Sequence, residues 1–277
     1  MNFFQLLKSV LDELYDEIPA KSEDKRDQYI LDKLTYLHGQ YANCWKGVNI
    51  DYRDPAVRFA YIYCYTTAHA SFVAQLIRSY QALRDLFTMA EVELSALGGG
   101  PGTELLAALK HIMRMGKEVK LRCNLFDREQ AWAEAWADVD KKITAPFTVS
   151  TRFLQMDVMD SNSWSIHKKY LRSDLFTLVY FISEISANRE QASPYFRHLF
   201  DKAVPGSLFL YIDNNNSRFF DWYDSLAKEQ GLYTIKSEEG EMGTTTDEEK
   251  KDLGRYFEKF GCPKLGAQVA IRLHRKA

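Results

Sequence analysis

Residues 92–104 run from an apolar segment through a glycine-rich turn into an amphipathic segment, and this feature constrains the fold more than any other. The turn reads Gly98-Gly99-Gly100-Pro101-Gly102. Glycine adopts positive φ and has no side chain in the way, so four glycines in five positions are expected where backbone passes close to a ligand. A helix predicted over 103–115 would point its unpaired N–H groups at the turn. We therefore expect a strand, a turn and a helix that together hold a nucleotide-like cofactor.

The spacing of the glycines separates the candidate cofactors. A dinucleotide fingerprint requires G-x-G-x-x-G, whereas here only Pro101 stands between the second and third glycines. A phosphate-binding P-loop requires G-K-[ST], and no lysine follows Gly102. What remains is a G-x-G-x-G turn, or a loop that simply joins a strand to a helix. The turn resembles motif I of the class I S-adenosylmethionine-dependent methyltransferases.

This resemblance covers about residues 90–277 and implies S-adenosyl-L-methionine as the cofactor. In the family, an acid that ends the second strand binds the ribose hydroxyls, and Asp127 ends the strand predicted over 119–126. An acid at the end of the third strand binds the adenine amino group, and Asp157 follows the segment 148–156. Either acid taken alone is better explained as a helix N-cap, but two acids at successive strand ends after such a turn favour the cofactor. The resemblance assigns the following residues to the cofactor: Gly98, Gly99, Gly100, Gly102, Glu104, Asp127, Arg128, Met156, Asp157, Val158 and Ser183.

One position departs from the family pattern. The family usually carries an acid two residues before the first glycine, where this chain has Ala96. Another contact must replace it, and Glu104 is one candidate. His69 and Tyr65, one turn apart in a helix predicted over 55–79, are further candidates for cofactor or substrate contacts. A lone histidine on a packed helix is more often a hydrogen-bonded core residue.

The end of the fourth predicted strand, 175–182, is where the family places the substrate group. The D/N-P-P-Y/F sequence that marks transfer to an exocyclic amine is absent, and Ser183 and Glu184 stand there instead. Glu184 is expected either to orient or deprotonate the acceptor or to cap the next helix. Asp213, at the end of the fifth strand, is the second candidate catalytic residue. Methyl transfer needs mainly an in-line arrangement of nucleophile and methyl group, so the lack of a Ser-His-Asp set does not exclude an enzyme.

The alternation of strand-like and helix-like segments after residue 90 predicts an α/β fold, a Rossmann-like seven-stranded and mostly parallel sheet with helices on both faces. We expect an N-terminal helical cap over 1–89 and a cofactor-binding domain over 90–277. An acidic insertion at about 238–266 is expected to close, with the cap, over the acceptor. The predicted strands are 92–97, 119–126, 148–156, 175–182, 206–213, 232–237 and 267–274, and the predicted helices of this domain are 103–115, 128–142, 161–172, 189–203, 217–230 and 247–260.

Composition narrows the compartment and the partners. The four cysteines are widely spaced without a C-x-x-C pair, which predicts neither a zinc site nor disulfides and fits a reducing compartment. No apolar run is as long as the roughly 20 residues of a membrane span, and the first residues lack the pattern of a signal peptide. We expect a protein of the cytoplasm, with the nucleus as the alternative, that uses no metal and no membrane.

The methyl acceptor is less constrained. Residues 175–185 and 205–213 resemble the fungal large-subunit rRNA uridine-N3 methyltransferases, which implies RNA, slightly favoured over a small molecule. The net charge of −2 gives no general basic excess, and the basic clusters within 110–122 and 167–172 are most simply solvated helix faces. Two other functions stay open: a catalytically silent, cofactor-binding scaffold, and a nucleotide-binding oxidoreductase, which the glycine spacing disfavours.

Overall fold

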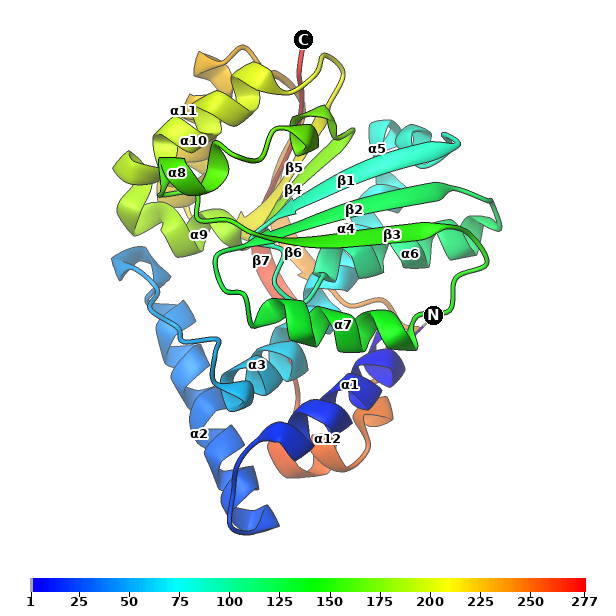
Figure 1. Cartoon of the computed structure of the whole chain (residues 1–277), viewed down its shortest axis with the longest axis vertical. Helices are drawn as coiled ribbons and strands as arrows, with labels where there is room; N and C mark the ends of the chain where they lie inside the picture. The colour runs from blue at the N-terminus through cyan, green and yellow to red at the C-terminus, as the bar shows by residue number, and fades with distance from the viewer. Residues whose placement is uncertain (1) are drawn as a thin grey trace.

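A seven-stranded sheet forms the centre of the molecule (Figure 1). The computed structural model describes residues 2–277. The strands are β1 (Glu91–Leu97), β2 (Lys120–Asp127), β3 (Val149–Gln155), β4 (Leu175–Val179), β5 (Leu208–Asn214), β6 (Tyr233–Gly243) and β7 (Gly266–Arg275). They lie in the order β3-β2-β1-β4-β5-β7-β6, and β7 runs antiparallel to both of its neighbours while the first five are parallel. This arrangement confirms the predicted Rossmann-like sheet.

The helices flank this sheet and also precede it. They are α1 (Phe3–Glu17), α2 (Glu23–Ala42), η1 (Cys44–Lys46), α3 (Pro55–Tyr61), η2 (Ile62–Thr66), α4 (Thr67–Ser79), α5 (Gln81–Leu86), α6 (Thr103–Met115), α7 (Trp132–Lys142), α8 (Ser161–Trp164), η3 (Lys169–Arg172), α9 (Phe181–Ile185), η4 (Ser186–Asn188), α10 (Arg189–Lys202), α11 (Ser217–Glu229), η5 (Lys250–Leu253) and α12 (Arg255–Phe260). Figure 1 shows α4 and α6 behind the sheet. Helices α10 and α11 pack their aromatic residues against β4 and β5.

Strand order reverses between β1 and β4, because the chain passes from β1 to β2 and β3 on one side and then returns to β4 on the other. In open α/β sheets, ligands bind beyond the carboxyl ends of the strands at such a reversal. The glycine turn follows β1, and α9 follows β4, so both border this crevice. The topology thus brings the two segments of most interest to one place.

The segment 161–172 is not the single helix that we predicted. It forms only the four-residue α8 and the four-residue η3, joined by a turn. The segment reads SNSWSIHKKYLR and lacks the apolar repeat at three and four residues that would hold a long helix on the sheet. As a result, Arg122 on β2 and Ser150 and Arg152 on β3 remain exposed on that face of the sheet.

The insertion also differs from the prediction. Strand β6 continues to Gly243 because residues 238–243 pair with β7. The remainder packs on α1, where the Glu248 carboxylate accepts the Phe3 N–H at 2.7 Å and forms an ion pair with buried Lys110 of α6. The cap residues and the sheet share one continuous apolar core. The insertion is therefore held at the α1 and α6 side of the molecule rather than over the crevice.

The predicted helix 55–79 is continuous in direction but changes its hydrogen-bonding pattern. It consists of α3, the π-helical η2 and α4. Pro55 begins it and the Asp54 side chain accepts the Ala56 N–H at 2.9 Å, as expected for a helix N-terminus. π-Helical turns occur often at functional sites, and Tyr61, immediately before this one, borders the crevice.

Candidate functional site

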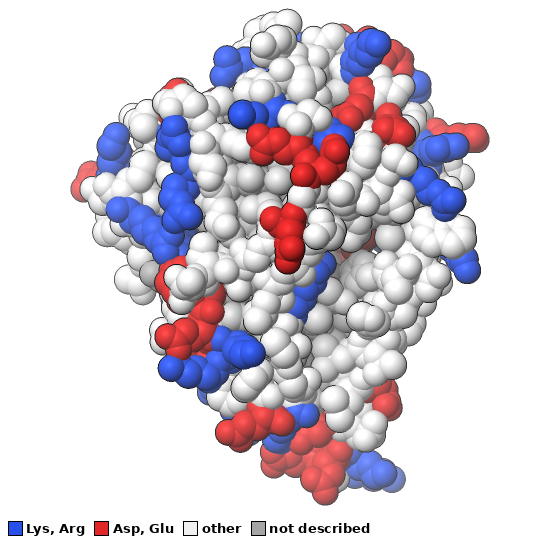
Figure 2. All heavy atoms as spheres, turned by 180° about the vertical axis from the view of Figure 1, so that it is seen from behind, with Lys and Arg blue, Asp and Glu red and all other residues white. Residues whose placement is uncertain are grey.

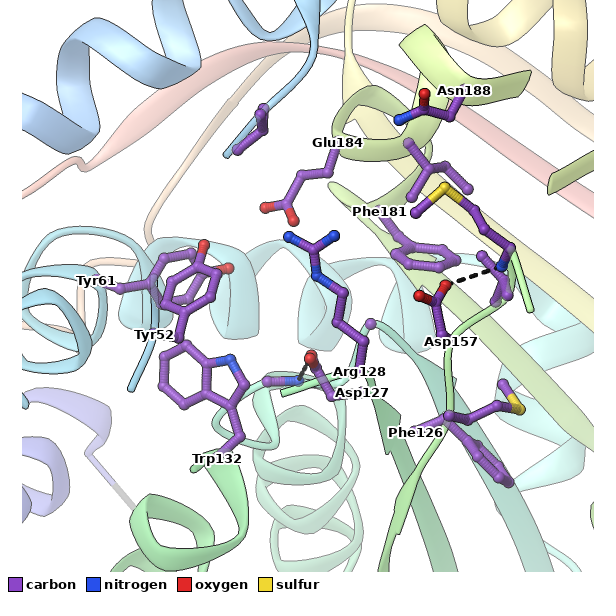
Figure 3. Close-up of a pocket in the computed structure, with 17 residues that line it drawn as sticks. Tyr52, Tyr61, Phe126, Asp127, Arg128, Trp132, Asp157, Phe181, Glu184 and Asn188 are labelled. Atoms are coloured by element: carbon purple, nitrogen blue, oxygen red, sulfur yellow. Dashed lines mark hydrogen bonds between the residues drawn. The ribbon is translucent and has the colours of Figure 1, made fainter. Parts of the chain in front are cut away.

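A pocket lies at the carboxyl ends of the parallel strands (Figure 3). Its walls come from the glycine turn, the segments that follow β2 and β3, helix α9, and two parts of the N-terminal cap. The lining residues are Val48, Tyr52, Tyr61, Gly98, Gly100, Phe126, Asp127, Arg128, Trp132, Met156, Asp157, Val158, Met159, Phe181, Glu184, Ile185 and Asn188. Gly98, Gly100 and six other residues that the sequence assigned to the cofactor or acceptor thus meet here: Asp127, Arg128, Met156, Asp157, Val158 and Glu184.

The glycine turn has the geometry that its sequence predicts. Gly98, Gly100 and Gly102 have φ values of +65°, +42° and +81°, in the left-handed region that favours glycine. A Cβ atom on Gly98 would lie 2.3 Å from the ring of Phe181. The Gly99 N–H donates to the Phe126 carbonyl at 2.9 Å, which holds the turn against the end of β2. The first glycine therefore lets the backbone and an aromatic wall of the pocket approach closely.

Asp127 links β2 to this turn. Its Oδ2 accepts the Gly100 N–H at 3.1 Å, and its Oδ1 accepts the Glu129 N–H at 3.0 Å. Burial raises the pKa of Asp127 to about 6, against the opposing effect of these two hydrogen bonds. A carboxylate has about four lone-pair positions, so two are left for ligand hydroxyls. The side chain is thus fixed in place and still able to accept hydrogen bonds.

Asp157 follows β3 on the opposite side of the pocket floor. Its Oδ1 accepts the Met159 N–H at 2.9 Å, as the dashed line in Figure 3 marks. Met156 and Val158 on either side are buried and apolar. A carboxylate acceptor flanked by apolar side chains is the arrangement that can bind a planar amino-substituted ring, with the ring between apolar groups and its amino group at the acid.

Glu184 approaches the pocket from α9. Its Oε1 accepts a hydrogen bond from the Tyr41 hydroxyl at 2.9 Å, and the Tyr41 and Tyr52 hydroxyls lie 2.5 Å apart. Burial raises the pKa of Glu184 to about 8, and the nearby Asp127 and Asp213 carboxylates raise it further. Figure 3 shows the Arg128 guanidinium pointing into the same space. A half-buried carboxyl of this kind can accept a proton near neutral pH.

Aromatic rings form the wall opposite α9. The Trp132 ring lies 4.9 Å from the Tyr52 ring and 5.4 Å from the Tyr61 ring, measured between centroids. We identified none of these three as site residues from the sequence. Their contribution depends on contacts between α7 and segments 70 to 80 positions earlier, and in the sequence they look like the aromatic residues of any packed helix. The one local signal was the density of tyrosines in 61–65.

Five of the predicted site residues lie behind the pocket surface. Gly99 and Gly102 shape the turn. Asp213 is fully buried, and its carboxylate accepts the Ser183 N–H at 2.8 Å and the Asn214 N–H at 2.7 Å. Asp213 and Ser183 together therefore fix the start of α9, which carries Glu184. This geometry favours a positioning role for Asp213 over the catalytic role that we predicted. Glu104 lies under the turn, is 1% exposed, and accepts from the Thr177 hydroxyl at 3.4 Å.

His69 and Tyr65 also lie outside the pocket lining. The His69 ring stacks on the Tyr180 ring at 4.0 Å and on the Tyr65 ring at 5.8 Å. Burial, with a smaller effect of Lys264, holds the pKa of His69 well below its usual value. Within residues 2–277 neither ring nitrogen of His69 has a hydrogen-bond partner. His69 is therefore a neutral, packed ring, which supports its interpretation as a core residue. It lacks the hydrogen bond that this interpretation predicted.

The buried Glu104 gives a testable pH dependence. Burial raises its pKa from 4.5 to about 8, so between these pH values the folded chain keeps a proton that the unfolded chain releases. The free energy of unfolding should therefore fall as the pH rises through this window. In Glu104→Gln we expect the fall to shrink by roughly 1–3 kcal/mol in urea unfolding measured across the window. The exposed Glu118→Gln should keep the wild-type dependence. An unchanged slope in Glu104→Gln would contradict this assignment.

Two further structural findings concern metals and membranes. Nowhere in residues 2–277 do three or more His, Cys, Asp or Glu side chains gather as ligands for a metal ion. Over the same residues, every helix is too short or too polar to span a membrane.

Comparisons with known proteins give likeness in structure only. No protein-family model matches the sequence, and no curated protein matches it. Among solved structures, the chain is similar to a Pyrococcus horikoshii protein provisionally assigned as an RNA methyltransferase, with 15% identity, 75% of this chain and 84% of that chain covered, and a TM-score of 0.44. A SAM-dependent methyltransferase of Methanosarcina mazei matches with 9% identity, coverages of 71% and 97%, and a TM-score of 0.47. An O-methyltransferase family 2 protein of Planctomyces limnophilus, solved with apigenin, matches with 13% identity, coverages of 95% and 65%, and a TM-score of 0.43. The likeness to these methyltransferases is one of overall fold.

Proposed function

We propose that this chain binds S-adenosyl-L-methionine in the pocket and transfers its methyl group to an acceptor. The observation that carries the proposal is the carboxylate of Asp127 at the glycine turn, hydrogen-bonded to the Gly100 N–H. A strand-end acid also binds the ribose of a dinucleotide, but a dinucleotide needs the N–H groups of the turn for its pyrophosphate, and here the Gly100 N–H is already donated to Asp127. A ribose with two free hydroxyls and no phosphate is compatible with this arrangement.

The remaining residues fit the same cofactor. Asp127 would accept from the ribose hydroxyls, and Asp157 would accept from the adenine amino group with Met156 and Val158 against the ring. Two carboxylates, those of Asp127 and Asp157, share the pocket with the carboxyl group of Glu184 and the guanidinium of Arg128. When bound, S-adenosyl-L-methionine supplies a methyl group activated by a positively charged sulfonium, and such a cation is favoured among carboxylates.

On the acceptor side we propose RNA, presented as an unstacked base. The rings of Tyr52, Tyr61 and Trp132 offer surfaces on which a planar base can stack. Glu184 would accept the proton that the nucleophilic atom of the base loses as the new bond to the methyl carbon forms. Tyr41 holds the Glu184 carboxyl through its hydrogen bond, and Asp213 fixes the start of the same helix.

Glu184→Gln separates acceptor chemistry from cofactor binding. We expect the variant to bind S-adenosyl-L-methionine within about threefold of wild type, because the ribose and adenine contacts remain. Methyl transfer should slow by about 100-fold, the lower end of what a positioned general base contributes. Tyr41→Phe should show a smaller loss, since it removes only the group that orients Glu184. Equal rates in wild type and Glu184→Gln would exclude this role.

Titration calorimetry with S-adenosyl-L-methionine tests the cofactor, with NAD(P)H as the competing candidate. Binding of the first and not the second is expected, and the reverse result would overturn the proposal in favour of an oxidoreductase. Incubation of the protein with methyl-labelled cofactor and separate pools of total RNA, protein and metabolites then tests the acceptor. Label in RNA is expected. Label in metabolites alone would assign a small-molecule acceptor, and cofactor binding without transfer to any pool would support the silent scaffold.

A further inference from the structure

The open face of β1, β2 and β3 carries a groove lined by cations. In Figure 1 these strands face the viewer without a long helix in front of them. The groove is lined by Arg122, Asn124, Ser150, Arg152, Lys169 and Arg172, with Glu93 at one side. Parallel strands are usually covered on both faces, so a polar, solvent-exposed face on three of them calls for an explanation beyond folding.

The groove gathers basic residues from three separate places in the sequence. Arg122 lies on β2, Arg152 on β3, and Lys169 and Arg172 on η3, which replaces the expected covering helix. In the sequence, two of these places read as ordinary solvated helix faces. The fold brings these basic residues together around one groove. The positive charge is therefore concentrated locally, although the net charge of the chain is −2.

Most of this positive charge is unpaired. Arg122 forms ion pairs with Glu91 and Glu93. Within residues 2–277, Arg152, Lys169 and Arg172 form no ion pair at 4.0 Å or less. All three are exposed. Figure 2 shows the opposite side of the molecule, where both acidic and basic side chains occur and basic ones also gather along the left edge. The groove is thus set up to bind an anion from solution.

The geometry points to a single strand of nucleic acid as the occupant: we propose that its phosphates lie along this groove. The groove spans β1 to β3, two strand spacings or about 10 Å, which admits one sugar-phosphate backbone. A double-stranded RNA is bound over about 16 base pairs and needs a far longer surface. Four cations around one groove match a chain of phosphates better than one isolated anion. The carboxylates of the methyl-transfer pocket keep phosphates out of the pocket itself, so the two surfaces divide the work between base and backbone.

The groove also lies beside the pocket. Arg152 in the groove and Asp157 in the pocket lining belong to one stretch of chain that starts in β3. The five residue steps from Arg152 to Asp157 cover at most roughly 17 Å of extended chain. The inference extends the proposed RNA acceptor by giving it a docking surface, but it is tested by binding alone.

The experiment is fluorescence anisotropy of a short labelled single-stranded RNA at a series of salt concentrations. With three to four phosphate contacts, the logarithm of the wild-type affinity should fall with the logarithm of salt concentration with a slope of about −2 to −3. The double variant Arg152→Glu/Lys169→Glu should bind the RNA at least tenfold more weakly at low salt. Its salt dependence should be shallower, with a slope between about −1 and 0. Lys21→Glu/Lys25→Glu changes the net charge equally at the far end of the cap, and should bind like wild type.

Several outcomes would overturn the inference: no RNA binding by wild type, an equal loss in both double variants, or binding abolished by inorganic phosphate at low concentration, which indicates a site for one phosphate. Arg152→Gln/Lys169→Gln serves as the second variant if the charge reversal unfolds the chain, as checked by circular dichroism. Both groove variants should still bind S-adenosyl-L-methionine. If the groove variants lose RNA binding and keep cofactor binding, the groove is the RNA-binding surface. If the wild-type protein does not bind the cofactor, the proposed function is wrong, whatever the result for the groove.

Discussion

Asp127→Ala is expected to weaken S-adenosyl-L-methionine binding by about 100- to 10,000-fold, the largest effect of any single substitution in the pocket. Two hydrogen bonds from ribose hydroxyls to an ionised carboxylate are lost, each worth about 1.5–3 kcal/mol. The variant also releases the Gly100 and Glu129 N–H groups that Asp127 now accepts. Titration calorimetry measures the affinity, and thermal unfolding shows how much of the loss comes from the fold. Asp140→Ala, on the exposed surface of α7, is the matched control and should bind normally.

The pH dependence of cofactor affinity is a second test of the role of Asp127. Because burial raises its pKa to about 6, the free protein should lose the acceptor form as the pH falls through that value. Cofactor affinity should be level above it and decline below it, while Asp127→Asn, already weak, should show no such decline. Full affinity in Asp127→Ala, or a wild-type affinity that does not change with pH, would place the ribose elsewhere.

Gly102→Ala is expected to destabilise the fold by about 2–5 kcal/mol. An alanine at φ +81° costs about 1–2 kcal/mol, and its Cβ would lie 2.4 Å from the ring of the buried Trp136, an overpacking that costs about 1–3 kcal/mol more. Gly116 at the other end of α6 is the matched control. Its φ is +63°, but nothing lies within 4 Å of the added Cβ. Gly116→Ala should therefore cost only the conformational part, about 1–2 kcal/mol.

Urea unfolding of the two variants measures this difference directly. The excess loss in Gly102→Ala is the cost of fitting the added Cβ against the Trp136 ring. Equal losses would mean that the Trp136 ring moves aside freely and that the turn is not held by it. Cofactor affinity should fall in Gly102→Ala and stay unchanged in Gly116→Ala, because Gly102 belongs to the glycine turn and Gly116 does not.

The sequence was sufficient to locate the parts of the site that depend on local pattern. Strand β1, the turn and α6 follow from one run of residues, and Asp127 and Asp157 follow from their places at strand ends. The same argument selected Asp213 equally well, although its oxygens accept the N–H groups of Ser183 and Asn214 inside the fold. A strand-end acid facing a ligand and one capping a helix have the same local sequence, so only the tertiary arrangement separates them.

Contacts between distant segments account for what the sequence did not predict. Tyr52 and Tyr61 reach the pocket because the cap packs beside α7, where they meet Trp132. The lack of a covering helix over β2 and β3 was readable in principle, since the segment 161–172 has few apolar residues. We nevertheless predicted a helix there, because the alternation of an α/β fold expects one between β3 and β4.

The hydrogen bond from the Phe3 N–H to the Glu248 carboxylate has a consequence for folding during synthesis. The first helix has its partner 245 residues downstream, and Asn2 donates to the Asp247 carbonyl and the Asp252 carboxylate as well. Helix α1 therefore cannot complete its contacts until residues 247–252 have left the ribosome. Contacts so far apart in sequence slow folding, since a long loop must close before they form. The start of α1, although it is synthesised before its partner segment, is thus secured only late in folding.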